Sequence, residues 1–195
     1  MEENTHDGEI DEMEIMDIRF ENADDLTVQM MNQVREEHFK ALRPAVIKVL
    51  FDLKKRVTNQ KLTLGRIMKA NDLIRNLTER FSPRGCDYVL FLDKMAWGLA
   101  SEEDKIRLMR HELRHGYYNP FAKNVWQLLP HDIEDFEAEI VLNRAEPGWA
   151  KRLAQITQAA YEQQADQAEQ AKQQPAKAVV AGHIVPIPRR RAANG

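Results

Sequence analysis

Two histidines one helical turn apart, with a carboxylate between them, are the side chains of this sequence best placed to do chemistry. They are His111, Glu112 and His115, in the segment HELRH. On a helix, positions i and i+4 lie on one face, about 5 to 6 Å apart at their β-carbons. Two imidazoles placed in this way can bind one tetrahedral Zn²⁺ ion, each at about 2.0 to 2.1 Å. Glu112 lies about 100° around the helix from His111, beside the metal, where it can act as the general base of an HExxH site.

The alternative is an ordinary charged helix that happens to contain two histidines. The surroundings favour the metal site. A predicted strand precedes the helix, Gly116 directly follows the second histidine, and a further histidine occurs downstream at the start of another predicted helix. The segment therefore predicts a catalytic metal site, for which a third ligand is needed.

The third ligand that we favour is His131, because a catalytic zinc site uses three protein ligands and leaves one position for water. His131 follows Pro130 and precedes the predicted helix DIEDFEAEIVLNRA, whose start would hold the imidazole in place. Glu134 and Asp135 remain alternatives, either as the ligand or as partners that orient a ligand imidazole. Acidic residues in the first turn of a helix also offset its dipole, which would explain these acids without any metal.

Composition indicates a soluble globular protein. The chain has 195 residues, of which 43% are hydrophobic and 30% charged, and its net charge is −3. This charge gives no general attraction to nucleic acid or to an acidic membrane. We expect neither a secretory signal nor a membrane span, because no basic start leads into an apolar run. The single cysteine, Cys86, cannot form an internal disulfide, which fits the cytoplasm and excludes a four-cysteine zinc site within one chain.

The two ends differ in composition from the middle of the chain. Residues 1–20 are strongly acidic and predict a flexible arm, and residues 154–174, rich in Ala and Gln, predict a helical extension. Residues 175–195 predict a disordered basic tail, in which Arg189, Arg190 and Arg191 could contact nucleic acid, although a short solvated tail is the simpler interpretation. Residues 21–153 are then one folded domain.

Within this domain, hydrophobic periodicity and capping residues predict alternating helices and strands. The predicted elements are a helix after Asn22 or Asp24, a strand in AVIKVLFDL, a strand in the ambiguous QKLTLGRIMKA, a helix in NDLIRNLTERF, a strand in DYVLFLDKMAW, and a helix in SEEDKIRLMRHELRHGYY. The fold class that follows is α+β, with a small mixed or antiparallel sheet of about three strands packed on the HExxH helix and on further helices.

The segment HELRH, followed after fifteen residues by HDIEDF, resembles the SprT-like zincins, and it is more similar to a family of phage metallopeptidases. The resemblance implies zinc bound by His111, His115 and His131, Glu112 as catalytic base, and a minimal zincin-like domain. Two differences separate the chain from SprT itself. No cysteine-rich zinc ribbon follows the site, and Asp132 stands where SprT has glycine.

The expected function is therefore that of a cytoplasmic, phage-type zinc metallopeptidase that hydrolyses peptide bonds with a zinc-activated water and Glu112 as general base. Its partner would be a protein or peptide substrate, not a membrane, and nothing in the sequence indicates an oligomeric state. The alternative is a non-catalytic metal-binding protein whose charged termini bind a protein or nucleic acid. An open ligand position beside Glu112 would favour the enzyme, and a fourth protein ligand the alternative.

Overall fold

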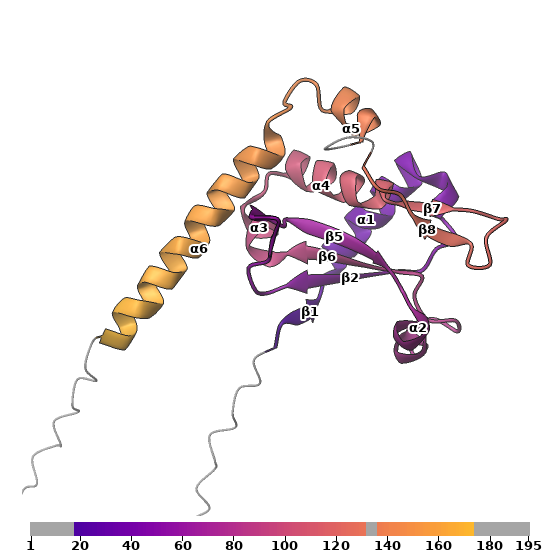
Figure 1. Ribbon diagram of the computed structural model, residues 1–195, viewed down its shortest axis with the longest axis horizontal. Coiled ribbons are helices and arrows are strands. Elements are labelled where there is room, and N and C mark those ends of the chain that lie inside the picture. Colours follow the sequence, from indigo (N-terminus) through magenta and orange to yellow (C-terminus); the bar gives the residue numbers. More distant parts are fainter. Residues whose placement is uncertain (1–17, 132–135, 174–195) are drawn as a thin grey trace, which may run out of the picture.

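The computed structural model describes residues 18–131 and 136–173, and its centre is a four-stranded mixed sheet (Figure 1). The strand order is β1 (Phe20–Asn22), β2 (Ile47–Asp52), β6 (Tyr88–Asp93) and β5 (Gly65–Lys69). Strands β2 and β6 are parallel, whereas β1 and β5 pair antiparallel at the two edges. The α+β class with a mixed sheet is confirmed, and the segment QKLTLGRIMKA does form strands, β5 and the short β4 (Lys61–Leu62), which pairs with β3 (Val57–Thr58).

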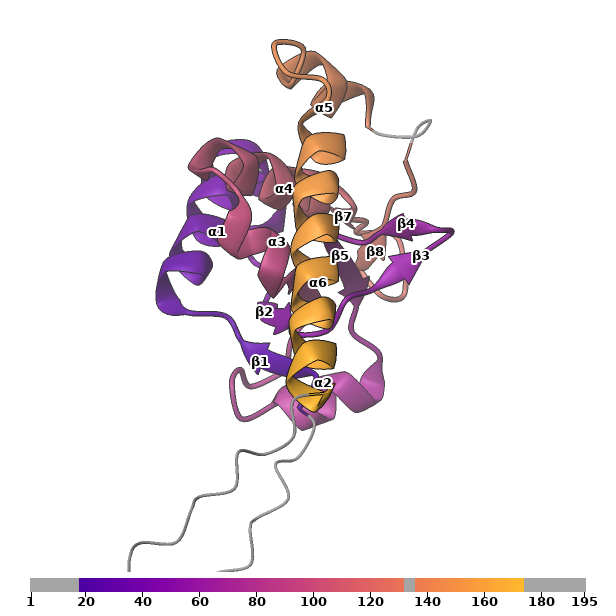
Figure 2. The ribbon, with the colours of Figure 1, turned by 90° about the vertical axis from the view of Figure 1, so that its left-hand side faces the viewer.

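Helices cover one face of this sheet (Figures 1 and 2). The main core joins α1 (Asp25–His38), α3 (Lys94–Leu99), α4 (Glu102–Arg114) and α6 (Trp149–Gln173) to the strands. Met31 of α1, Met109 and Leu113 of α4, and Leu153 of α6 belong to one buried cluster with Leu90 and Leu92 of β6. Because β6 is buried over its whole length, it is the central support on which α4 is held.

The opposite face of the sheet carries a smaller core beside α2 (Asp72–Thr78). Asn71 caps α2 through the Ile74 amide, as its sequence pattern predicts. The apolar positions that predict this helix nevertheless face solvent, since Leu73, Leu77 and Phe81 are 65%, 64% and 52% exposed. Their periodicity indicates the helix correctly, although the face that they form is not the one that packs.

Two predicted elements end earlier than their patterns suggest. The strand in DYVLFLDKMAW stops at Asp93, because the Asp93 carboxylate accepts a hydrogen bond of 2.8 Å from the Ala96 amide and caps α3. The HExxH helix stops at Arg114, so Tyr117 lies in a strand and not on the helix. The sequence does not predict edge strand β1, because its three residues are too few to show a period.

Most of the chain segment between His115 and His131 forms a β-hairpin. It consists of β7 (Gly116–Tyr118) and β8 (Trp126–Leu128), with Gly116 paired to Leu128 and Tyr118 to Trp126. The predicted elements do not include this hairpin, although Asn119-Pro120 is a turn signal between two aromatic runs.

The segment after His131 forms a shorter helix than predicted. α5 spans Glu137–Leu142, with Phe136 as its N-cap, so His131 does not lie at the start of α5. Asp132, Ile133, Glu134 and Asp135 lie outside the described residues, as do the predicted acidic arm through residue 17 and the basic tail. Within the described ranges, no helix combines the length and apolar character needed to cross a bilayer.

Candidate metal centre

Helix α4 positions the first two histidines through its buried face. Ser101 caps the helix by accepting a hydrogen bond from the Asp104 amide, at 3.2 Å. Met109 and Leu113 are fully buried in the main core, which fixes the rotation of α4 about its axis. His111 and His115 are therefore held on a partly exposed face of the helix, one turn apart.

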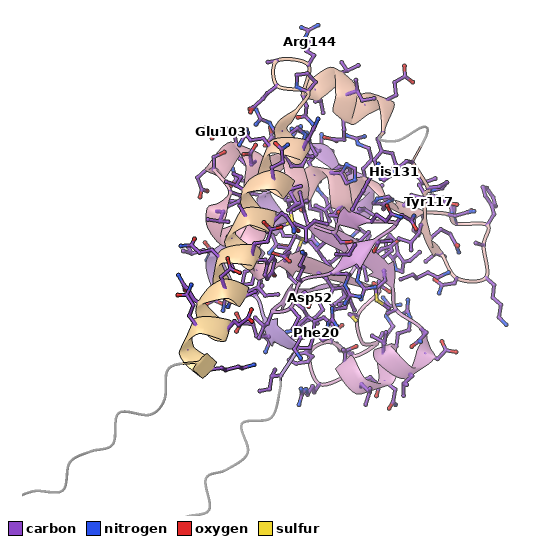
Figure 3. All side chains as sticks on the ribbon, turned by 60° about the vertical axis from the view of Figure 1, so that its left-hand side comes forward. Phe20, Asp52, Glu103, Tyr117, His131 and Arg144 are labelled. Atoms are coloured by element: carbon purple, nitrogen blue, oxygen red, sulfur yellow. The ribbon has the colours of Figure 1, made fainter. Side chains whose placement is uncertain are left out.

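The structure brings His131 to these two histidines. One ring nitrogen from each of His111, His115 and His131 can be chosen so that all three lie within 4.8 Å of one another, an arrangement that could hold a metal ion. The Nε2 atoms of His131 and His111 are 3.1 Å apart, close to the separation of about 3.3 Å between two ligands of a tetrahedral zinc. Figure 3 shows His131 and Tyr117 on the side of the molecule away from α6.

The hairpin orients His115. Its Nδ1 lies 2.7 Å from the Leu129 carbonyl oxygen, and the Leu129 amide donates to the His115 carbonyl, also at 2.7 Å. A carbonyl can only accept, so Nδ1 carries the proton and Nε2 has the lone pair with which imidazole binds metals. The same two hydrogen bonds place the chain that leads to His131 alongside α4.

Phe136 forms an apolar wall against all three imidazoles. Its ring centroid lies 4.7 Å from that of His115, 5.0 Å from His131 and 5.6 Å from His111, and the side chain is 3% exposed. The sequence pattern indicates Phe136 only as a packing position of a helix. Its contact with the site could not be read from spacing, because it depends on how α5 docks on α4.

Glu112 is buried between α4 and edge strand β5. Its side chain is 5% exposed, and a β-carbon added to Gly65 would come within 3.1 Å of its Oε1 atom. Burial raises the pKa of Glu112 to about 8, while a hydrogen bond from the Ile67 amide opposes this shift. A carboxyl group with a pKa near neutrality is suited to accept and return a proton.

A buried cluster of charged and polar side chains joins α4 to α5, and no sequence pattern predicts it. It consists of Arg110, Arg114, Glu139 and Asn143. Glu139 is fully buried and accepts hydrogen bonds from Arg110, at 2.7 Å, and from Arg114, at 2.8 Å. Arg110 also donates to the Asn143 side chain, at 2.5 Å. These contacts hold α5 against α4, and thereby hold Phe136, its N-cap, against the histidines.

We therefore expect Glu139→Gln to lower stability and to weaken metal binding. Removal of one partner from a buried ion pair costs about 3 to 5 kcal/mol, which corresponds to a fall of roughly 10 °C in melting temperature for a domain of this size. Thermal unfolding followed by circular dichroism, together with metal titration, measures both effects. Glu79→Gln, an exposed carboxylate outside the cluster, is the matched control. Equal melting temperatures for the two variants would show that the cluster does not hold α5.

The comparison with protein families gives the class of the chain. Residues 18–161 match the family described as "Putative phage metallopeptidase". The chain belongs to this family. The phage metallopeptidase match begins before β1 and ends within α6, so it includes the sheet, α4, the hairpin and all three histidines. Membership implies a metal ion and peptide hydrolysis as the class of activity. Among the described residues, His111, His115 and His131 form a group that could hold such an ion.

Comparisons with curated proteins and with solved structures identify no similar protein. The similarity to SprT-like zincins therefore remains a prediction from the two motifs.

Proposed function

We propose that this phage metallopeptidase is zinc-dependent, that His111, His115 and His131 bind the zinc, and that Glu112 is the general base. The observation that carries the proposal is the meeting of three imidazoles from two distant segments on the helix that also bears Glu112. Three histidines are the ligand set of one known class of catalytic zinc site, in which the fourth position is left for water or substrate. The group formed by His111, His115 and His131 has the same three imidazoles.

In the proposed reaction, the zinc and Glu112 would have different roles. Zinc, when bound, would act as a Lewis acid and lower the pKa of water toward about 7. Glu112 would accept a proton from the attacking water and return it to the leaving amine. Its buried position favours this role, because a carboxylate removed from water accepts a proton more readily than a solvated one. The nearby cation would offset part of this shift.

The surrounding contacts would keep the ligands in place during this reaction. The Leu129 carbonyl holds the proton of His115 on Nδ1, so that the imidazole binds through its other nitrogen. Phe136 excludes water from one side of the three rings, which strengthens the electrostatic interactions among the groups there.

Metal content and its removal test this proposal directly. We expect about one zinc per purified chain by elemental analysis, and loss of hydrolysis of an unfolded protein substrate after chelation. Activity should return with added Zn²⁺ but not with Mg²⁺, because imidazole ligands suit zinc better than magnesium. At a free Zn²⁺ concentration about 100 times Kd, the melting temperature should rise by about 5 to 10 °C. A purified protein without metal, whose melting temperature does not respond to Zn²⁺, would refute the proposal.

A further inference from the structure

A second candidate site lies on the hairpin that separates His115 from His131. An open hollow of about 940 Å³ is lined by the 3₁₀ turn η1 (Lys40–Leu42), the start of α2 and the β7–β8 hairpin. Figure 1 shows α2 and this hairpin at the same end of the sheet. None of the three histidines lines the hollow. It is therefore a site separate from the candidate metal centre.

The hollow is rich in positive charge, most of which has no local partner. Lys40, Arg75, Arg84 and Lys123 all line it. Arg75 forms an ion pair of 2.9 Å with Asp87. Lys40, Arg84 and Lys123 are exposed, and none of them forms an ion pair with a residue in the described ranges 18–131 and 136–173. Three unpaired cations around one hollow attract an anion, although the whole chain is slightly acidic.

Aromatic rings accompany these cations. Tyr118, which lines the hollow, is 45% exposed, and its ring is supported from behind by buried Trp126, at 5.2 Å between centroids. Phe121, on the same hairpin and two residues before Lys123, is 97% exposed. Exposed aromatic rings beside cations are how proteins hold unpaired nucleic-acid bases, which stack on the rings while cations contact the phosphates.

We propose that this hollow binds single-stranded nucleic acid, with phosphates on Lys40, Arg84 and Lys123 and a base stacked on Tyr118. The exposed Tyr118 ring favours nucleic acid over an acidic peptide, because an acidic peptide would use the cations and leave the ring without a stacking partner. The Asp72 carboxylate in the same hollow can accept a hydrogen bond from an N–H donor on the edge of a base. A duplex is disfavoured, since its bases are stacked on one another and cannot stack on Tyr118.

The site goes beyond the proposed peptidase activity and does not depend on it. It does share the hairpin with the metal centre, because Gly116 and Leu128, at the base of the hairpin, adjoin the segments that carry His115 and His131. A bound single strand would therefore lie on the element that connects two of the three proposed ligands.

Fluorescence anisotropy with a labelled oligo-dT strand of about 20 nucleotides tests the proposal on the full-length protein. Lys40→Glu combined with Lys123→Glu should weaken binding at least about 10-fold near 0.1 M salt. It should also reduce the slope of log K against log salt by about 0.7 for each phosphate that the protein no longer neutralises. Tyr118→Ala should weaken binding roughly 5- to 100-fold, whereas Tyr118→Phe, which keeps the stacking ring, should bind as the wild type does.

The controls separate the hollow from other sources of positive charge. Lys61→Glu combined with Lys151→Glu makes the same change of charge at exposed positions outside the hollow and should have little effect. A variant with Arg189, Arg190 and Arg191 changed to Ser tests the basic tail, and it should retain most of the affinity. Circular dichroism of each variant confirms that the fold is intact.

Three results would overturn the proposal. The first is a loss of binding in the tail variant only. The second is a wild-type protein that does not bind the strand at low salt. The third is equally tight binding of polyglutamate or of a duplex, with no effect of Tyr118→Ala.

Discussion

Glu112→Gln is expected to remove peptide hydrolysis while it leaves the fold and the zinc content unchanged. The amide side chain has the shape of the carboxylate and can still form hydrogen bonds, but it cannot accept a proton from water. Loss of a general base typically lowers the rate by about 10² to 10⁴. Wild type and variant would be compared on an unfolded protein substrate, with zinc measured on the same samples.

Glu103→Gln is the matched control for this variant. Glu103 is an exposed acid on the same helix, α4, and its change should leave the rate unaffected (Figure 3). If Glu112→Gln and wild type hydrolyse the substrate equally fast at equal zinc occupancy, Glu112 is not the base. The non-catalytic metal-binding function would then replace the peptidase.

His131→Ala should weaken zinc binding about as much as His111→Ala or His115→Ala, and each variant should lose the stoichiometric metal. The reason is geometric, because the ring nitrogens of all three histidines come together and a zinc left with two imidazoles lacks the third protein ligand of a catalytic site. Competition with a chromophoric zinc chelator measures the affinity. His38→Ala, on the exposed surface of α1, is the control and should bind zinc as wild type does.

The acidic alternatives to His131 are tested in the same assay. Glu134→Ala and Asp135→Ala should reduce zinc affinity by at most about 10- to 100-fold, which is typical of partners that orient a ligand imidazole. Abolished binding in Glu134→Ala, together with normal binding in His131→Ala, would show that the third ligand was assigned to the wrong residue.

Features that depend on neighbours along the chain could be predicted from the sequence. Ser101 caps α4 and Asn71 caps α2, because a capping side chain bonds to amides two or three residues away. The relation between His111 and His115 is equally local, since the pitch of a helix alone places positions i and i+4 together. Buried strands β2 and β6 were recognisable because their apolar residues run almost without interruption.

Features that depend on contacts between distant segments had to come from the tertiary structure. The sequence alone determined that a helix presents two imidazoles and a carboxylate, and it indicated His131 only as a candidate. The arrival of His131 at the site depends on the pairing of Gly116 with Leu128 and on the hydrogen bonds between His115 and Leu129, which no local pattern encodes.

The surroundings of the three histidines have the same origin. Phe136 and Glu139 reach α4 because α5 docks there, and the burial that raises the pKa of Glu112 exists only once β5 covers it. Helix pitch acts within one segment. By contrast, the approach of the third histidine, the packing of Phe136 against the imidazoles and the burial of the Glu112 carboxyl group require several segments to pack together.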